Sequence, residues 1–274
     1  MGEMEVRYLD GGGFALDGGA MFGVVPKVLW EKRVVPDEKN RIRMRANSLL
    51  VRAAGKTIVI ETGNGTKWDA KLRGIYGVQD GDPLMDSLKR EGVEPKDVDL
   101  VINTHLHFDH AGGNTRVEGN RVVPTYPRAK YVVQRGELEH ARKATERDKA
   151  SYFAENFEPV AEAGQWELLD GDAEIVPGIT VTKIPGHNAD IQAVVLEGGG
   201  KTVVFVADLF PTRHHIALPW IAAYDLYPLM TLETKREWVK KIEEGKWMVV
   251  FGHDADVAVG VVGEKGMVEK AAGW

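Results

Sequence analysis

Three histidines and one aspartate lie within six residues of the short stretch "NTHLHFDHAGGN", which runs from Asn103 to Asn114. Imidazole nitrogens and carboxylate oxygens are donor atoms that zinc and similar divalent ions take from proteins. His105 and His107 are alternate residues, so their side chains point the same way in an extended segment. Asp109 continues that alternation and His110 follows it. The stretch can therefore present metal ligands to two adjacent points.

Three further potential ligands stand alone, each after a strongly apolar segment that we interpret as a strand. They are His187 after 179–184, Asp208 after 201–207 and His253 after 246–251. Any one of them alone would more often be structural than functional. Four strand ends that carry the same donor chemistry indicate a shared site, because ligand sites in open sheets gather at one end of several strands.

The rest of the chain alternates β-branched apolar segments with fewer helical ones. The predicted strands are 47–53, 56–61, 98–103, 129–134, 179–184, 191–197, 201–207 and 246–251. The predicted helices are 82–92, with Asp82 as N-cap and Pro83 in the first turn, 136–149, which is mostly polar and expected on the surface, and 232–245. The glycine-rich stretches 10–19 and 197–202 predict turns, and "RIRMR" (41–45) predicts the solvated face of a strand.

Several of these strands are apolar throughout, so they need cover on both faces. Two sheets with helices outside would provide that cover. The sequence contains no linker, low-complexity tract or clear repeat, so we expect a single domain over residues 1–274.

Composition and charge exclude several classes of protein. The net charge is −6, from 35 basic and 41 acidic residues, which disfavours a nucleic-acid partner. The N-terminus lacks the basic and apolar regions of a secretion signal, and no apolar run approaches the roughly 18–20 residues of a membrane span. We therefore expect a cytoplasmic protein that acts on a small molecule and has no membrane partner. The absence of cysteine excludes disulfides, thiol catalysis and thiolate metal ligands.

The succession "THLHFDHAGG", "PGH", "AD" and "GHD" resembles the motifs of the metallo-β-lactamase superfamily, from about position 45 to the end. The resemblance implies an α/β fold, a four-layer αβ/βα sandwich in which two mixed sheets lie face to face with helices outside. It also implies two divalent metal ions at one edge, with zinc as the first choice and manganese, iron and cobalt as alternatives.

The same resemblance assigns roles by position in the motifs. His105, His107 and His187 would bind the first metal, Asp109, His110 and His253 the second, and Asp208 would bridge them. A hydroxide shared by the two metals would attack the substrate, and Asp109 would pass its proton to the leaving group. Glu61, where the family usually carries aspartate, would support a ligand histidine from behind. His140, in a polar helical segment, is predicted to be exposed.

Within the superfamily, "HLHFDHAGGN", "YVVQRGELEHA", "EIVPGITV" and "VVFGHD" are similar to N-acyl homoserine lactonases and to methyl parathion hydrolases. The resemblance implies hydrolysis of a lactone or ester carbonyl. One alternative is an organophosphate triester or aryl ester hydrolase, which "ADLFPTRHH" and "YDLYP" resemble more. Another is a glyoxalase II-like thioesterase, for which Lys265 and Lys270 are the available basic residues. A mononuclear iron dioxygenase on this fold is a different class, and the full set of seven ligands argues against it.

One position departs from the lactonase pattern. Lactonases usually carry a tyrosine three residues after the bridging aspartate, where this chain has Pro211, and Tyr224 is our candidate to replace its hydroxyl. We expect an apolar substrate pocket, and its candidate residues are Phe22, Phe108, Thr212 and His214. Phe22 fits plain core packing equally well. In this family a segment such as 18–30 often forms a lid or a dimer contact, so a homodimer is expected.

Overall fold

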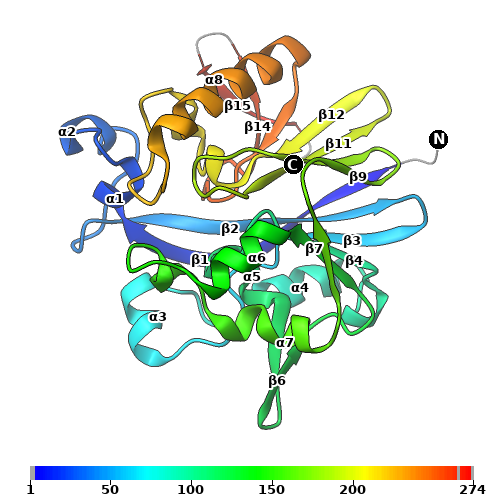
Figure 1. Cartoon of the computed structure of the whole chain (residues 1–274). Coiled ribbons are helices and arrows are strands. Elements are labelled where there is room, and N and C mark those ends of the chain that lie inside the picture. Colours follow the sequence, from blue (N-terminus) through cyan, green and yellow to red (C-terminus); the bar gives the residue numbers. More distant parts are fainter. Residues whose placement is uncertain (1–3, 264–265, 273–274) are drawn as a thin grey trace.

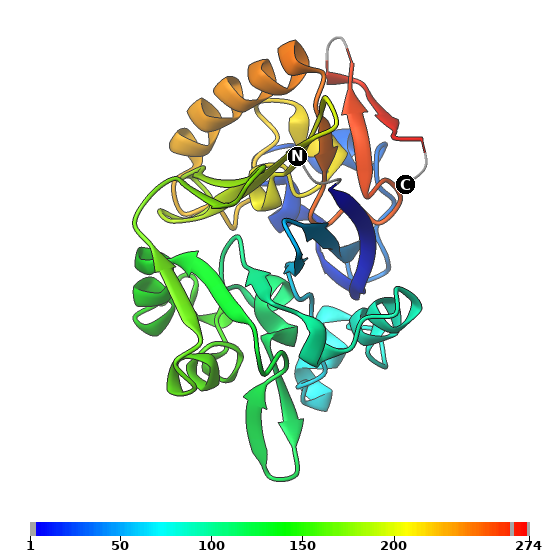
Figure 2. The same cartoon turned by 90° about the vertical axis from the view of Figure 1, so that its right-hand side faces the viewer.

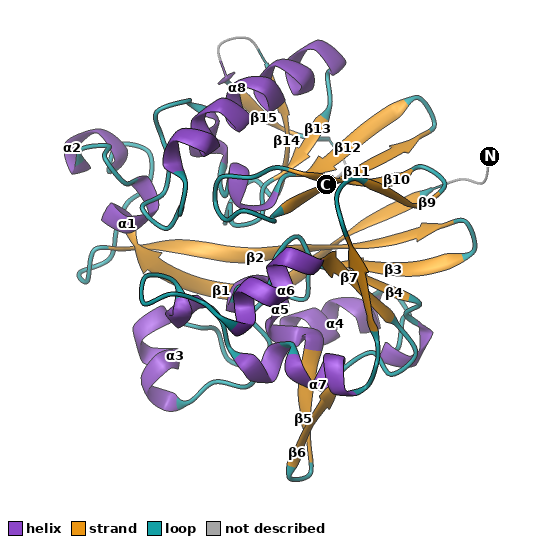
Figure 3. Cartoon of the chain, viewed as in Figure 1, coloured by secondary structure: helices purple, strands orange, loops and turns teal. Residues whose placement is uncertain are grey.

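The structure, a computed structural model, describes residues 4–263 and 266–272. Two large sheets form the inner layers, and helices cover their outer faces (Figure 1). Figure 3, which colours strands and helices differently, shows the same layering. The predicted four-layer sandwich is thereby confirmed. Within the described residues, no helix is both long and apolar enough to cross a membrane.

The first sheet has six strands, antiparallel at β1–β2–β3 and parallel from β3 onward. In spatial order they are β1 (Glu5–Asp17), β2 (Arg41–Ala53), β3 (Lys56–Ile60), β4 (Leu100–Ile102), β7 (Lys130–Gln134) and β8 (Trp166–Leu169). A separate hairpin, β5 (Thr115–Glu118) and β6 (Arg121–Pro124), projects away from the layers (Figure 2).

The second sheet has seven strands, and only its β12–β13 pair is parallel. In spatial order they are β15 (Val268–Lys270), β14 (Val259–Val262), β13 (Met248–Val250), β12 (Lys201–Phe205), β11 (Gln192–Gly198), β10 (Ile179–Lys183) and β9 (Ala173–Val176). All eight predicted strands are present, with slightly different ends. The sequence patterns missed the strands β1, β5, β6, β8, β9, β14 and β15.

The described α-helices are α1 (Gly18–Phe22), α2 (Lys27–Trp30), α3 (Ala70–Tyr76), α4 (Pro83–Arg90), α5 (Phe108–Ala111), α6 (Arg135–Arg142), α7 (Glu158–Glu162) and α8 (Pro228–Gly245). Short 3-10 turns are η1 (Pro95–Asp97), η2 (Gly112–Asn114), η3 (Lys149–Ser151), η4 (Ala154–Asn156), η5 (Ala207–Leu209) and η6 (Arg213–Ile216). Asp82 caps α4 as predicted, since its Oδ1 accepts a hydrogen bond from the Met85 amide.

The strands of the first sheet bury both faces, as their apolar sequences predict. In β2, Leu49 and Val51 pack into the core between the sheets, whereas Leu50 packs with Leu84 and Leu88 of α4. The basic end of β2 alternates as predicted, with Ile42 and Met44 buried. This two-sided burial makes the sheets rigid supports for the loops that leave them.

The prediction of a turn over 10–19 was wrong, because most of this stretch belongs to β1. Its pairing with β2 shifts between Asp10 and Gly13, which marks a β-bulge. A Cβ on Gly11 would lie 2.5 Å from the carbonyl oxygen of Ala46, and Gly12 has a φ of +107°. Here the glycines allow a bulge and a close backbone approach, rather than a chain reversal.

The polar helix predicted over 136–149 is shorter and less exposed than expected. It ends at Arg142, and both Glu137 and Leu138 are buried. The prediction that His140 is exposed was also wrong, since its side chain is only 28% exposed and its Nε2 lies 2.5 Å from Oδ2 of Asp148. The helix packs one face against the core, and an acidic residue on that face interrupts the apolar pattern.

Candidate metal centre

The first sheet supplies four of the candidate ligands. β4 ends at Ile102, and the segment after it carries His105 and His107 into α5. This short helix holds Asp109 and His110 in its only turn. The strand-to-helix transition therefore gathers four donor side chains at one end of the sheet, and all four are buried.

The second sheet supplies the other three, each after a strand as the sequence predicts. His187 follows β10, Asp208 lies in η5 after β12, and His253 follows β13. The parallel pairing of β12 with β13 brings Asp208 and His253 to the same end of the sheet. Ala207 has a φ of +46°, and this left-handed conformation turns the chain sharply just before Asp208.

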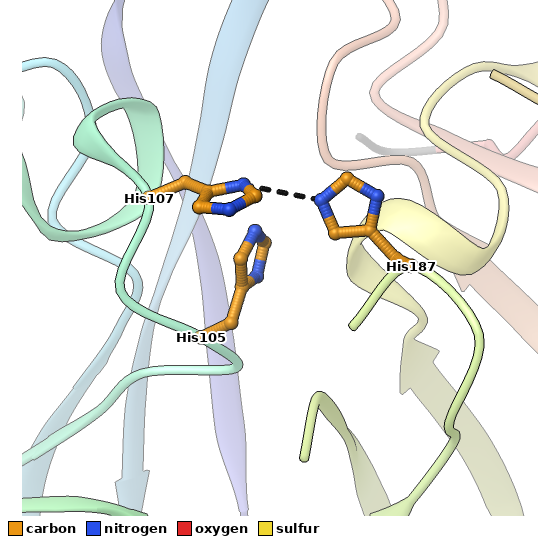
Figure 4. Close-up of side chains that lie close together, drawn as sticks. All are labelled: His105, His107 and His187. Atoms are coloured by element: carbon orange, nitrogen blue, oxygen red, sulfur yellow. Dashed lines mark hydrogen bonds between the residues drawn. The ribbon is translucent and has the colours of Figure 1, made fainter. Parts of the chain in front are cut away.

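The seven side chains converge into overlapping groups, each of which could hold a metal ion. The groups are His105–His107–His187, His105–His110–Asp208 and Asp109–His110–His253, and within each the donor atoms lie within 4.8 Å of one another. Figure 4 shows the first group, in which His105 and His107 approach His187 from the opposite side. The Nδ1 atom of His107 lies 3.1 Å from Nε2 of His187.

The spacing of the ring nitrogens fits a shared cation. Nε2 of His110 lies 2.9 Å from Nε2 of His253, which is similar to the His107–His187 distance. Zinc bonds of about 2.0–2.1 Å in a tetrahedron place neighbouring ligand atoms about 3.3 Å apart. Two imidazoles can share only one proton at such a contact, so a metal ion satisfies both nitrogen lone pairs better.

Asp208 lies between the two halves of the cluster. Its Oδ2 lies 3.3 Å from Nε2 of His187, whereas its Oδ1 lies 3.0 Å from Nε2 of His253 and 3.3 Å from Nε2 of His110. Oδ2 of Asp109 lies 3.4 Å from Nε2 of His253. One carboxylate thus faces both groups of histidines, as a bridging ligand would.

Two donor atoms of the cluster are buried without a hydrogen-bond partner among the described residues. They are Nε2 of His105 and Oδ1 of Asp208. A buried polar atom without a partner costs about 1–3 kcal/mol. A metal ion among these atoms would remove that cost, so the residues present fit a metal centre.

The charges inside the cluster strongly perturb its titration. Burial, and then the neighbouring His110, hold the pKa of His105 well below its usual range. Burial alone would raise the pKa of Asp208, but His253, His110 and His187 together hold it well below its ordinary value. Burial alone would lower the pKa of His110 and of His187, but the Asp208 carboxylate raises both. Because metals bind neutral imidazole, binding at these two rings would release protons.

Polar groups lie beside the far nitrogens of three rings. Glu61 Oε2 lies 3.2 Å from Nδ1 of His110, close but not aligned for a hydrogen bond, which supports the role expected for Glu61. Asp225 Oδ1 lies 2.9 Å from Nδ1 of His187. Nδ1 of His253 lies 3.2 Å from the carbonyl oxygen of Arg45. Such contacts fix the tautomer and the ring orientation of a ligand histidine.

Asp225 and Glu137 were missed by the sequence reasoning. Asp225 lies in the aromatic stretch "WIAAYDLYP", where an acidic residue among apolar neighbours was a signal for a buried partner. Glu137 lies in a polar helical segment that offered no such signal. Both are almost completely buried in the structure.

An aromatic cluster packs beside Asp109 and His253. Phe108 was predicted for the pocket, and its ring contacts Tyr76, Trp68 and Phe153 at centroid distances of 4.9, 5.2 and 5.5 Å. Phe14 packs edge-on against both Phe108 and His253. Trp68, Tyr76 and Phe153 are only partly buried, so the cluster presents an apolar surface next to the candidate ligands.

Two tyrosines lie near Asp109. Burial, and then the Asp109 carboxylate, raise the pKa of Tyr76. Burial raises the pKa of Tyr224 to about 12, with smaller effects of Tyr76, Asp17 and Asp109. Tyr224 is 37% exposed. Both hydroxyls are therefore protonated at neutral pH and can donate a hydrogen bond, whereas the sequence had suggested Tyr224 alone.

The structure does not support the other pocket candidates. Phe22 is fully buried and stacks on Trp30 and His215, so core packing explains it. Thr212 is buried, and its hydroxyl contacts Nδ1 of His215 at 2.8 Å. His214 lines a separate cavity of about 660 Å³, and none of the seven candidate ligands is among the described residues that line it. Nε2 of His215 lies 2.8 Å from the carbonyl oxygen of Met21, so this ring packs against the N-terminal segment.

Two sequence expectations receive no test. Lys265 lies outside the described residues, and Lys270 is exposed on β15. Val24 and Val28 in the segment 18–30 are 89% and 63% exposed, but the dimer contact predicted there stays a prediction.

Known proteins share both the sequence and the fold. Residues 41–253 match the metallo-beta-lactamase superfamily. An N-acyl homoserine lactonase of Bacillus thuringiensis is 30% identical over 196 residues, which cover 70% of each chain. The solved structure of a probable metal-dependent hydrolase from Staphylococcus aureus is 30% identical, with a TM-score of 0.92 over 98% of this chain and 96% of that one.

A second solved structure is that of a dizinc quorum-quenching lactonase in complex with its product. It is 21% identical, with a TM-score of 0.76 over 97% of this chain and 92% of that one, and it shows the fold alone. The superfamily match spans most of the sequence and includes every candidate ligand. The chain belongs to the metallo-beta-lactamase superfamily and is a metal-dependent hydrolase.

Proposed function

We propose that this hydrolase opens lactones or cleaves esters with apolar substituents, and that it uses two divalent metal ions. The observation that carries the proposal is the position of Asp208, whose two oxygens face His187 on one side and His110 with His253 on the other. The proposed ligands are those expected from the sequence: His105, His107, Asp109, His110, His187, Asp208 and His253. Zinc is the proposed ion, because the donors are imidazole and carboxylate groups.

Bound at this site, two such ions would lower the pKa of a shared water towards 7 and polarise the substrate carbonyl. The protein residues would move protons and stabilise charge. Asp109 would take the proton from the attacking water and deliver it to the leaving oxygen. A hydroxyl from Tyr224, or from Tyr76, would donate a hydrogen bond to the oxygen on which negative charge develops.

The aromatic cluster supports an apolar substrate. Trp68, Tyr76 and Phe153 surround Phe108, which directly precedes Asp109. An acyl chain placed against these rings would lose contact with water, at about 25 cal/mol for each Å² of apolar surface buried. The lactonase relative supports the same substrate class, because its name states that it acts on N-acyl homoserine lactones, which carry an acyl chain on a lactone ring.

Metal analysis and a substrate panel test the proposal. We expect about two zinc-like ions per chain and turnover of acylated lactones by the metal-loaded protein. The same preparation would be assayed with aryl esters, phosphotriesters and thioesters. If lactones are not hydrolysed but a phosphotriester or a thioester is turned over rapidly, the lactonase proposal is wrong. The activity on that other substrate would then take its place. One tightly bound iron per chain would contradict the proposed two-metal centre.

A further inference from the structure

Glu137 on α6 is a fully buried carboxylate that accepts hydrogen bonds from three different segments. Its Oε1 accepts from the backbone N–H of Leu106 at 2.8 Å and from the Tyr152 hydroxyl at 3.1 Å. Its Oε2 accepts from Nδ2 of Asn188 at 2.8 Å. An unpaired buried carboxylate is costly, but three donors satisfy this one.

The partners of Glu137 lie directly beside candidate ligands. Leu106 stands between His105 and His107, and Asn188 follows His187. The first two histidines follow β4 of the first sheet, whereas His187 follows β10 of the second. Glu137 therefore joins two loops from different sheets at the point where both deliver ligands to the same group.

Two other buried carboxylates contact ring nitrogens. Glu61 and Asp225 lie close to the ring nitrogens of His110 and His187, and Glu61 Oε1 also accepts a hydrogen bond of 2.5 Å from the backbone N–H of Thr104. Glu137 contacts a backbone amide and an asparagine side chain, so it controls where the loops lie rather than how a ring is protonated. The Tyr152 ring packs edge-on against the His107 ring at a centroid distance of 4.6 Å, which extends this support to that ligand.

We propose that Glu137 is a positioning residue that sets the distance of His105 and His107 from His187, and thereby the affinity of that one metal site. This inference rests on the proposed metal centre. The group Asp109–His110–His253 lies on the other side of Asp208 and has its own supports in Glu61 and the Arg45 carbonyl. The effect of Glu137 is therefore selective for one of the two sites.

A double-mutant cycle in metal affinity tests this selectivity. His253→Ala removes a ligand of the second site, and His187→Ala removes a ligand of the first. Glu137→Gln keeps the size of the side chain but turns an amide N–H₂ towards the Asn188 donor. We expect Glu137→Gln to weaken cobalt binding by about 10–100-fold in the His253→Ala background and to leave it unchanged in the His187→Ala background. Affinity would be measured by competition with a chromophoric chelator.

A rescue variant separates positioning from general destabilisation. Adding Asn188→Asp to Glu137→Gln reverses donor and acceptor, so the bridge between the loops re-forms with the same net charge. We expect the pair to recover most of the lost affinity and the cobalt absorption spectrum of the parent protein. Glu139→Gln, at an exposed position on the same helix, is the matched control. It should change neither the cobalt affinity nor the cobalt absorption spectrum.

The possible outcomes distinguish this inference from the proposed function. If the unsubstituted protein binds fewer than two ions, the proposed two-metal centre is wrong, and the inference about Glu137 falls with it. If it binds two ions but Glu137→Gln weakens cobalt binding equally in both backgrounds, the positioning role is wrong. The role is also wrong if the rescue pair recovers none of the lost affinity. Should Glu137→Gln not fold, Asn188→Ala cuts the bridge on the His187 side alone, and it must show the same selective loss for the inference to stand.

Discussion

His187 and Asp225 form a buried pair in which Nδ1 of the histidine lies 2.9 Å from Oδ1 of the aspartate. The other aspartate oxygen accepts a hydrogen bond of 2.7 Å from the Thr231 hydroxyl of α8. The Nε2 atom of His187 is thereby directed at His107 and Asp208. A helix that carries none of the candidate ligands thus fixes the orientation of a candidate ligand ring, as carboxylate–histidine pairs do in metal sites.

Asp225→Asn should weaken metal binding about 10–100-fold with little change of fold. The amide is the same size, but it no longer provides a negative charge and leaves the ring orientation less strongly fixed. Chelator competition with zinc measures the affinity, and Asp170→Asn, at an exposed position, is the control. An Asp225→Asn protein with the affinity of the control would show that this pair has no influence on the metal.

Asp208→Ala should reduce metal content much more than His140→Ala. The Asp208 carboxylate faces ligands on both sides of the cluster, so its loss removes charge from both sites, whereas His140 pairs with Asp148. Metal content of the purified variants, measured by elemental analysis, checks this order. Equal metal content in the two variants would contradict the bridging role of Asp208.

Removal of the metal should abolish hydrolysis and lower the thermal unfolding midpoint. Seven donor side chains, six of them buried, then converge without a cation. Ligands that bind only the folded state raise its stability. Both properties should return when zinc is added back. Full hydrolytic activity after exhaustive chelation, with metal loss verified, would exclude a metal-dependent reaction.

Tyr224→Phe should lower kcat about 10–100-fold while metal content stays unchanged. This loss corresponds to about 1.4–2.7 kcal/mol in the activation barrier, which is the scale of one lost hydrogen bond to a charged group. Steady-state kinetics on a lactone substrate measures it, with Tyr227→Phe three residues away as the control. If Tyr224→Phe is silent and Tyr76→Phe lowers kcat instead, the donor is Tyr76.

The contribution of Lys235 to stability should rise with pH. Its buried ammonium donates to the carbonyl oxygens of Ala217 and Trp220 at 2.9 and 2.8 Å, and burial lowers its pKa from 10.5 to about 7. Between these two values the unfolded chain binds more protons than the folded chain, so the folded state gains stability as pH rises. The free energy of unfolding of the unsubstituted protein, relative to that of Lys235→Met, should therefore increase by up to about 1.4 kcal/mol per pH unit.

Denaturant unfolding of both proteins between pH 7 and 10 tests this prediction. The window follows from the lowered and ordinary pKa values of Lys235. Metal-free protein would be used, so that metal release does not contribute to the difference. A difference that stays flat across the window would show that the surrounding carbonyls keep the ammonium charged in the folded state.

Most of the core strands were predictable because their signals are local. β3, β4 and β12 each hold three consecutive apolar residues bounded by turns or by polar residues, and burial on both faces explains why these three are all apolar. The strand β1 was not predictable in the same way, since its glycines look like a turn. Only the close approach of Gly11 to Ala46 in the folded chain explains why glycine stands in a strand.

The sequence by itself determined the fold class and the candidate ligands, because a ligand motif after a strand depends on neighbours only a few residues away. His105, His107, Asp109 and His110 could be recognised from their spacing alone. The tertiary structure decided which residues support them. Glu137 accepts hydrogen bonds from Leu106 and Asn188, which lie 31 and 51 residues away from it in the sequence. A buried polar side chain takes whatever partner the packed elements bring to it, and that partner is fixed only when both sheets are assembled.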